Sequence, residues 1–443
     1  MSLSALTEFV QNPNPPESAR AFAATLLIDT LAVCAGAARL EVGQIVRDHA
    51  VRHFAAGPDA PSATLLFDGR RASVPGAAFA AASQTDNLDA HDGLNLTKGH
   101  IGCAVVPALM AFAEEKDLSG PEALDLMVMA YEVAARAAVA LHGTVSDYHT
   151  SGAWNGLGVA ALGWRLLNAP PAALQHALGI AEYHGPRSQM MREIANPTML
   201  HDGSGMGAMT GAMAALLAAD GFTGAPALTV EAAEVAEVWA DLGADWTIER
   251  NYIKPYPICR WAHAALDGLR ALQLAQEVTP ETVAQIEVRT FAEAAALYAE
   301  MPDTTSQAQY SLPFALATQL RFGRIGPEHV SGPALSDPET ARLLPCITVV
   351  EDPALSARFP ADRVSEVRVT LRTTGARHAS GVVYARGGPE APMGDGEVKA
   401  KVLSMATPTL GAARAGALWQ MRDRLLDPGA RFSELFDVVH RPA

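Results

Sequence analysis

The sequence predicts a mainly α protein with a large all-helical domain and a smaller α+β lid domain. Apolar residues recur at three-and-four spacing from residue 17 to about 275, which is the period of a helix packed on a core. After about residue 278 the pattern changes to short β-rich segments, and helical spacing returns near the C-terminus. The chain has 443 residues, of which 49% are hydrophobic and 18% charged, so it can bury a large core.

Residues 1–275 are expected to form the first part of the helical domain. Gly-Pro and Pro-Pro pairs separate its apolar segments. Pro121 and Pro171 suit first helical turns, where a backbone N–H would have no partner in the helix. A short strand is expected over Thr64–Phe67. The expected helices are Ser18–Ala37, Ser73–Ser83, Ala104–Lys116, Pro121–Gly143, Ser151–Leu167, Ala172–His184, Gly205–Ala219 and Ile258–Ala275.

Residues 276–405 are expected to form the lid domain, and residues 406–443 a C-terminal helical segment that returns to the helical domain. Thr374-Gly375 suits a hairpin turn. Clefts between domains are favoured ligand sites, so the boundary near 275–280 bears on function. The expected strands are Ile286–Phe291, Ile347–Glu351, Val364–Thr373 and His378–Ala385, and the expected helices are Ala308–Phe322, Asp337–Leu344, Asp395–Met405 and Leu410–Leu426.

Composition narrows the class of protein. A net charge of −15 without a basic stripe argues against a nucleic-acid partner. The four cysteines are scattered without zinc spacing, which predicts a reduced, cytoplasmic protein. The N-terminus has no signal-peptide pattern. The most apolar segment, Ala21–Ala38, is interrupted by Asp29, so we expect a buried helix and no membrane association.

The most informative motif is Lys-Pro-Tyr-Pro-Ile-Cys-Arg-Trp-Ala-His, from Lys254 to His263. Its prolines hold φ fixed and push the residues before them out of the helical region, and a helix is expected soon after the second proline. Arg260 and His263 then share one helix face, where Asp267 is placed to orient the imidazole. Because a helix N-terminus attracts anions, these cations and Tyr256 are candidate ligands of an anionic substrate. The alternative is an ordinary surface helix start.

A second cluster is rich in aspartate and histidine, and it lies between two expected helices. It contains Asp86, Asp89, His91 and, a little further on, His100. Carboxylates near a histidine can tune it as a general base. A metal site is the rival interpretation, but no HExxH-type spacing supports it. A capped, solvated loop is the third.

Three further residues are candidates on weaker patterns. His149 faces a cavity or helps to cap the helix that starts at Ser151. Arg187 and His201 are candidate anion ligands. Cys103 and Cys259 neighbour polar clusters, but a buried apolar role is favoured for both.

In this order the clusters resemble the MmgE/PrpD family, which includes 2-methylcitrate dehydratase, cis-aconitate decarboxylase and iminodisuccinate epimerase. The resemblance covers nearly the whole chain. It implies a helical domain built from both chain ends, a smaller α+β lid, a homodimer, and catalysis without metal or organic cofactor in a cleft between the domains. It rests on Asp86–Asp92, on His100 before an apolar helix, on Leu200-His201-Asp202-Gly203 and on the Lys254–His263 motif.

Carried over by position, the resemblance implies catalytic roles for a few residues and also marks three departures. The implied catalytic residues are Asp86, His100, His149 and Lys254, with Asp89 also in the motif. The departures are Thr198 where the dehydratases and decarboxylases have a lysine, Cys259 where the decarboxylase has a histidine, and Phe314 where the lid helix has a tyrosine, with Tyr310 one turn away. His91, inside an insertion of its loop, is a candidate to compensate.

The residue chemistry and the resemblance agree that cations hold carboxylates while histidines move a proton on the adjacent carbon. We expect a cofactor-independent, dehydratase-like lyase that acts on a small di- or tricarboxylate, with His100 or His91 as the base. An epimerase or isomerase of a small dicarboxylate is the nearest alternative. A non-catalytic carboxylate-binding protein and a metal-dependent hydrolase are the other two. We expect no cofactor or metal.

Overall fold

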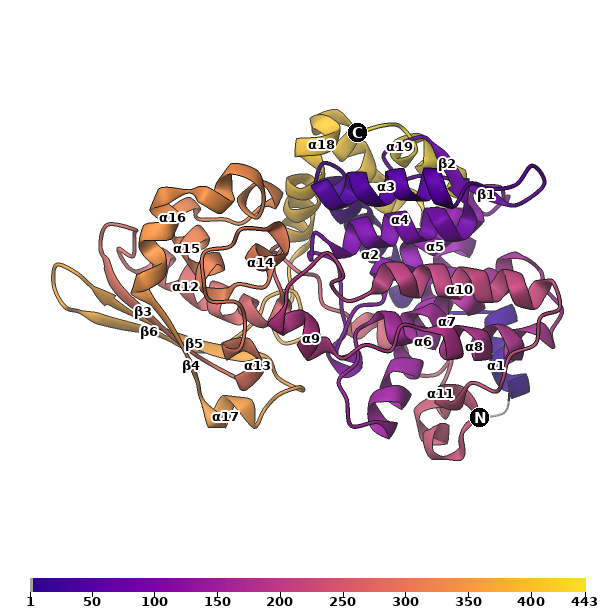
Figure 1. Ribbon diagram of the computed structural model, residues 1–443, viewed down its shortest axis with the longest axis horizontal. Coiled ribbons are helices and arrows are strands. Elements are labelled where there is room, and N and C mark those ends of the chain that lie inside the picture. Colours follow the sequence, from indigo (N-terminus) through magenta and orange to yellow (C-terminus); the bar gives the residue numbers. More distant parts are fainter. Residues whose placement is uncertain (1–2) are drawn as a thin grey trace.

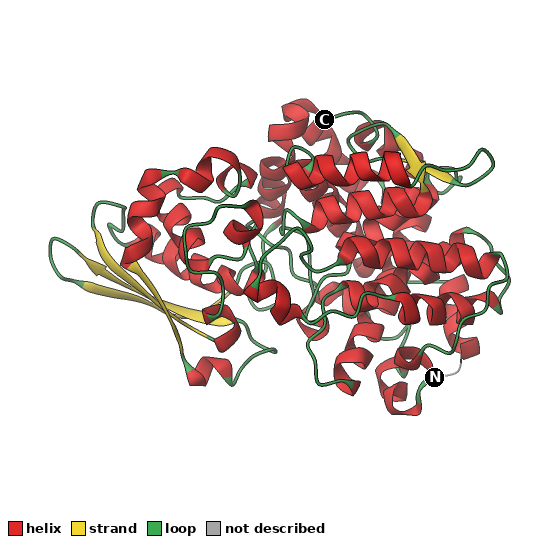
Figure 2. Ribbon diagram, viewed as in Figure 1, coloured by secondary structure: helices red, strands yellow, loops and turns green. Residues whose placement is uncertain are grey.

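The computed structural model describes residues 3–443 and confirms the predicted fold class. A helical body and a smaller part with a twisted sheet lie beside each other (Figures 1 and 2). The N-terminal helices and the C-terminal helices both belong to the helical body, while the strands of the sheet lie between residues 283 and 384 (Figure 1).

Closely packed helices form the core of the helical body. Helix α10 packs on α7, α4 and α8, and α6 packs on α7. A Cβ on Gly156 would lie 2.8 Å from the carbonyl oxygen of Gly207, so glycines let α7 and α10 approach closely. These helices are α4 (Val74–Asp86), α5 (Gly102–Ala113), α6 (Gly120–Thr144), α7 (Gly152–Leu166), α8 (Ala173–His184) and α10 (Ser204–Ala219).

Helix α2 (Glu17–Ala37) lies inside this body and packs against α18 (Asp395–Arg424). Among residues 3–443 it is the one helix long and apolar enough to cross a membrane, but 78% of its apolar window is buried. Lys401 of α18 donates to Asp29 of α2 at 2.6 Å. The two helices expected at 395–426 run as one element with a kink, where Gly411 has a φ of +74°. The segment after the sheet therefore packs back onto the N-terminal helices.

The lid carries a four-stranded sheet in the order β4-β3-β5-β6. Strand β3 (Val283–Thr290) pairs parallel to β4 (Ile347–Glu351) and antiparallel to β5 (Val364–Leu371), and β5 pairs with β6 (Arg377–Tyr384) as a hairpin. Helix α12 (His263–Ala275) packs on β5 and β6, and α15 (Leu312–Phe322) packs on α12 and β4.

The remaining elements are short. Two strands, β1 (Ser62–Thr64) and β2 (Arg71–Ser73), form a small hairpin. The strand expected at Thr64–Phe67 was wrong beyond Thr64, because residues 66–68 form a turn, where Phe67 has a φ of +60°. The other α-helices are α1 (Leu3–Gln11), α3 (Glu41–His53), α9 (Met190–Ala195), α11 (Leu228–Glu231), α13 (Ala292–Ala295), α14 (Thr305–Gln309), α16 (Pro338–Leu343), α17 (Pro353–Ser356) and α19 (Phe436–Val439). The 3-10 helices are Asn95–Thr97, Ala233–Trp239, Thr247–Arg250, Arg260–Ala262, Pro327–His329, Gly332–Ser336, Leu344–Cys346 and Phe432–Leu435.

Candidate active site

A narrow pocket lies where the helical body, the lid and the segment between them meet. Both His100 and Lys254 line it, although 154 positions separate them in the chain. A backbone bridge between Gly93 and Tyr252 ties their two segments together. The lining residues are Asp89, Lys98, His100, Tyr148, Met190, Asp202, Tyr252, Lys254, Cys259, Arg260, Trp261, Tyr310 and Arg363.

A larger hollow lies close by, between residues 39–42 and residues 303–306. The described residues that line it include no histidine, lysine or cysteine. The larger hollow holds Arg39, Glu41 and Asp303, but the narrower pocket brings histidine, lysine, arginine and aspartate together, so we place the chemistry there.

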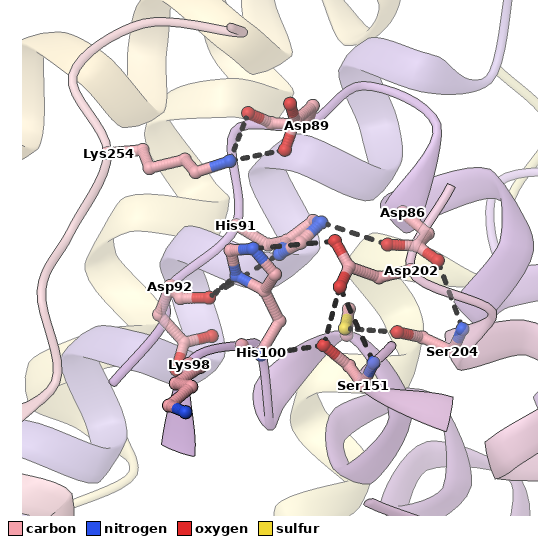
Figure 3. A network of polar contacts seen from close by, with 12 residues as sticks. Asp86, Asp89, His91, Asp92, Lys98, His100, Ser151, Asp202, Ser204 and Lys254 are labelled. Atoms are coloured by element: carbon pink, nitrogen blue, oxygen red, sulfur yellow. Dashed lines mark hydrogen bonds and ion pairs between the residues drawn. The ribbon is translucent and has the colours of Figure 1, made fainter. Parts of the chain in front are cut away.

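His100 is held in one tautomer. Its Nδ1 lies 2.7 Å from the carbonyl oxygen of Asp92, which can only accept, so Nδ1 carries the proton and Nε2 has the free lone pair. Its backbone N–H donates to the hydroxyl of Ser151 at 2.9 Å. Burial, followed by the charges of His91 and Lys254, lowers the pKa of His100 well below its usual value. The imidazole is therefore neutral and basic at Nε2, which lies 3.6 Å from Oδ2 of Asp202 (Figure 3).

His91 and Asp86 lie behind His100 and do not line the pocket. The His91 ring stands perpendicular to the His100 ring at 4.4 Å, and its Nε2 is 3.3 Å from Asp86 (Figure 3). Asp86 also accepts from the backbone N–H of Ser204 at 3.0 Å. Burial lowers the pKa of His91 to about 4 and raises the pKa of Asp86 to about 7. This pair supports the ring of His100 from behind.

One group of side chains in residues 3–443 has the make-up of a metal site. Ligand atoms of Asp86, His91 and Cys103 lie within 4.8 Å of one another. The Cys103 thiol donates to Ser204 at 2.9 Å, and burial raises its pKa well above the usual value. The thiol of this group therefore acts as a neutral hydrogen-bond donor.

Lys254 is fully buried and already paired. Its ammonium group contacts the carboxylate of Asp89 and donates to the carbonyl oxygen of Asp89 at 2.9 Å (Figure 3). Burial lowers the pKa of Lys254, but the charges of Asp89, Tyr252 and Cys259 and the hydrogen bond to Asp89 together outweigh it, so the pKa is raised overall. This ion pair joins the elbow motif to the aspartate-rich loop.

Two guanidinium groups lie against the ring of Tyr252, and their hydrogen bonds differ. Arg260 donates to the carbonyl oxygens of Arg386 at 2.6 Å and Ala385 at 3.0 Å. Burial lowers its pKa to about 10. Arg363 is also buried, but its Nε and one terminal nitrogen have no hydrogen-bond partner. Arg363 therefore has donors to offer a ligand, whereas Arg260 has committed its terminal nitrogens to the backbone.

The helix after the elbow starts later than the sequence predicts, and this changes two assignments. A 3-10 turn precedes α12, which begins at His263. His263 donates from Nε2 to the carbonyl oxygen of Ile258 at 2.8 Å, so Asp267 does not orient it. Asp267 instead accepts from the hydroxyl of Tyr256 and from Arg386, both at 2.8 Å. His263 and Tyr256 brace the elbow and do not line the pocket.

The weaker candidates also lie outside the pocket lining. The backbone N–H of His149 donates to Nε2 of the His142 ring at 3.2 Å. Arg187 is exposed and lies 3.9 Å from Glu182. His201 is buried with its ring 5.3 Å from that of Tyr310, and burial lowers its pKa to about 3.

Several pocket residues were missed or were not assigned a role from the sequence. Asp202 lies in the Leu200–Gly203 motif and lines the pocket. The sequence pattern that could have identified it is a carboxylate between a histidine and a glycine. Arg363 gave no signal beyond its place before a buried strand, because nothing near it in sequence belongs to the site. Lys98, Tyr148 and Tyr252 also line the pocket. Thr198, at the position aligned with the family's lysine, is exposed, and its hydroxyl donates to Glu193 at 3.0 Å.

Family comparisons cover nearly the whole chain. The MmgE/PrpD N-terminal domain matches residues 3–241, and the MmgE/PrpD C-terminal domain matches residues 256–426. No curated protein matches the chain significantly. Because the two domain matches follow each other in order, the chain belongs to the MmgE/PrpD family, whose members are in general dehydratase-like enzymes.

Proposed function

We propose that the protein is a cofactor-independent lyase that removes water from a small di- or tricarboxylate, with His100 as the base. The observation that carries the proposal is the fixed tautomer of His100. Its Nδ1 proton is committed to the Asp92 carbonyl oxygen, and its basic Nε2 faces the pocket beside cationic groups. A neutral, oriented imidazole in a site for anions is suited to take a proton next to a carboxylate.

The cations of the pocket support the choice of substrate class. Arg363 has unpartnered donors, and Lys98 is half-buried at the same pocket. A guanidinium group matches a carboxylate with two parallel hydrogen bonds. Removing the α-proton builds negative charge on that carboxylate, and fixed cations stabilise the charge as it forms. We assign Arg363 and Lys98 to the substrate carboxylates, and the Lys254–Asp89 pair to holding the loop.

The geometry favours elimination over epimerisation. An epimerase needs two proton-transfer groups on opposite faces of one carbon. Nε2 of His100 and Oδ2 of Asp202 are only 3.6 Å apart, so both can reach the same side of a bound substrate. Two groups on one side suit the removal of a proton and a neighbouring hydroxyl from the same face.

We also propose a homodimer in the cytoplasm. Exposed apolar side chains gather around α9 and α10, and such groups mark protein contacts. They are Tyr183, Met191, Met199, Leu200, Met206 and Met213. The solution mass from light scattering tests the dimer, and a Leu200→Lys change is expected to shift it toward the monomer.

The test of the base is turnover of a panel of hydroxydi- and hydroxytricarboxylates, malate and citrate among them. His100→Ala is expected to lower turnover at least about 100-fold in a variant that still unfolds cooperatively. His378→Ala, on the edge strand β6, is the matched control and keeps wild-type turnover. An active His100→Ala variant would rule out this base. Deuterium that enters unreacted substrate without elimination would instead favour the epimerase. Turnover that a chelator leaves unchanged would exclude the metal-dependent hydrolase.

A further inference from the structure

The pocket contains the carboxyl group of Asp202, to which the proposed function assigns no role. Asp202 is buried between α7 and α10, and it comes directly before the glycine that precedes α10. Its Oδ1 accepts from the hydroxyl of Ser151 at 2.8 Å, and its backbone oxygen accepts from the N–H of Gly152 at 2.9 Å. These bonds fix Asp202 at the start of α7.

The other oxygen of Asp202 is directed differently. Oδ2 lies 3.6 Å from Nε2 of His100, at the pocket, on the far side of the carboxyl from Ser151 (Figure 3). Ser151 holds both partners, because its hydroxyl donates to Asp202 and accepts from the backbone N–H of His100 at 2.9 Å. One serine thus sets the spacing between an imidazole and a carboxyl group.

We propose that Asp202 is the general acid that protonates the departing hydroxyl group. The inference rests on the proposed function, and it adds the second proton-transfer group of the same reaction. His100 Nε2 takes the proton from the carbon next to the carboxylate, and that C–H electron pair becomes the new carbon–carbon double bond. The neighbouring C–O bond breaks with its electron pair on oxygen. That oxygen takes the carboxyl proton of Asp202 and leaves as water.

The environment of Asp202 suits this role. Burial and the nearby Asp86 raise the pKa of Asp202, while the Ser151 hydroxyl opposes them. The carboxyl group is therefore protonated at higher pH than a solvated aspartate. After water has left, His100 carries a proton and Asp202 a negative charge. The short distance between them lets the proton pass from Nε2 to Oδ2, which restores both groups for the next turnover.

The test compares two leaving groups. The probes are the panel acid that the wild-type enzyme converts fastest and the same acid with chloride in place of the hydroxyl, which for malate is chlorosuccinate. Chloride leaves without a proton, whereas hydroxide does not. Asp202→Asn is expected to slow loss of water at least about 100-fold and to leave loss of chloride near the wild-type rate. Because chloride loss needs a folded pocket, it also reports on folding.

The controls separate this inference from the function on which it rests. Asp147→Asn, an exposed carboxylate two residues before His149, is expected to change neither rate. His100→Ala is expected to slow both reactions. If Asp202→Asn slows neither reaction, or slows both equally, Asp202 is not the acid, while the base stands on the His100 result. If His100→Ala leaves both rates unchanged, or no panel acid is converted, the proposed function fails as well.

Discussion

The two walls of the pocket carry different chemistry. The helical wall presents His100 and Asp202, and hydrogen bonds from Ser151 and to Asp92 fix both side chains. The lid wall presents Arg363, whose Nε and one terminal nitrogen have no partner. Groups that must move a proton between fixed atoms are held rigidly, and a group that must grip a ligand keeps its donors free. The hydrogen-bond partners that a side chain already has therefore indicate its role better than its residue type does.

The largest effect on stability is expected at the ion pair that joins the elbow motif to the aspartate-rich loop. Lys254 and Asp89 form a fully buried ion pair, and removing one partner leaves the other charge without compensation. Lys254→Met is expected to lower the free energy of unfolding by about 3–5 kcal/mol. Chemical denaturation of the whole chain, followed by circular dichroism, measures it.

A double variant sharpens this expectation. Lys254→Met together with Asp89→Leu removes both charges, and an apolar pair can replace a buried ion pair with little loss. We expect the double variant to be more stable than Lys254→Met alone. Equal stability of the two would show that the contact contributes little and that the walls are held together elsewhere.

A smaller effect is expected from the two arginines beside Tyr252. Arg363→Leu removes free donors, so KM for the panel substrate is expected to rise about 10- to 100-fold, which is about 1.4–2.7 kcal/mol of binding. Arg260→Leu leaves two backbone carbonyl oxygens without their donor, so it is expected to lower stability by about 1.5–3 kcal/mol. Steady-state kinetics and denaturation are measured on both variants. The reverse pattern would mean that Arg260 holds the substrate.

The spacing of apolar residues predicted the architecture, because helices and strands depend mainly on residues that are close in sequence. Apolar spacing located both ends of α2, α6 and α7 within a few residues, but it failed at the start of α12, where a 3-10 turn follows the prolines. The expected orientation of His263 by Asp267 assumed that regular helix and was wrong.

The pocket was harder to predict, because its residues meet only through tertiary structure. Motif order pointed to His100 and Lys254, which share the pocket. Nothing in the sequence shows that the carbonyl oxygens of Arg386 and Ala385 occupy the donors of Arg260. Nor does it show that Arg363, which precedes β5 and lies about a hundred residues further along the chain, reaches the same pocket. The hydrogen-bond partners of a side chain come from distant parts of the sequence. They decide whether that side chain can bind a substrate or instead stabilises the fold.

The smallest effect concerns the pH dependence of stability. Asp92 lies behind His100 on the helical wall, and burial together with Asp29 raises its pKa to about 7. An unfolded aspartate titrates near pH 3.9, so the folded protein binds more protons between about pH 4 and 7, and stability falls as pH rises through that range. Asp92→Asn removes this loss. The stability of the variant relative to the wild type is expected to rise with pH by at most about 1.4 kcal/mol per unit. Urea unfolding at pH 5, 6 and 7 measures it.

The lid contains a carboxylate whose pKa is shifted in the opposite direction from that of Asp92. Asp352 is bonded to Arg289 at 2.8 Å, and this hydrogen bond lowers the pKa of Asp352. Its contribution to stability is present above the unfolded pKa and is lost as pH falls through the folded one. Asp352→Asn is therefore expected to be less stable than the wild type at pH 7 and to approach it in acid, which is the reverse of Asp92→Asn. Subtracting the wild-type curve removes the other buried groups, including Asp86 and His91, whose pKa values shift in opposite directions. Two curves of the same sign would mean that burial does not hold the Asp92 carboxyl group neutral in the folded protein.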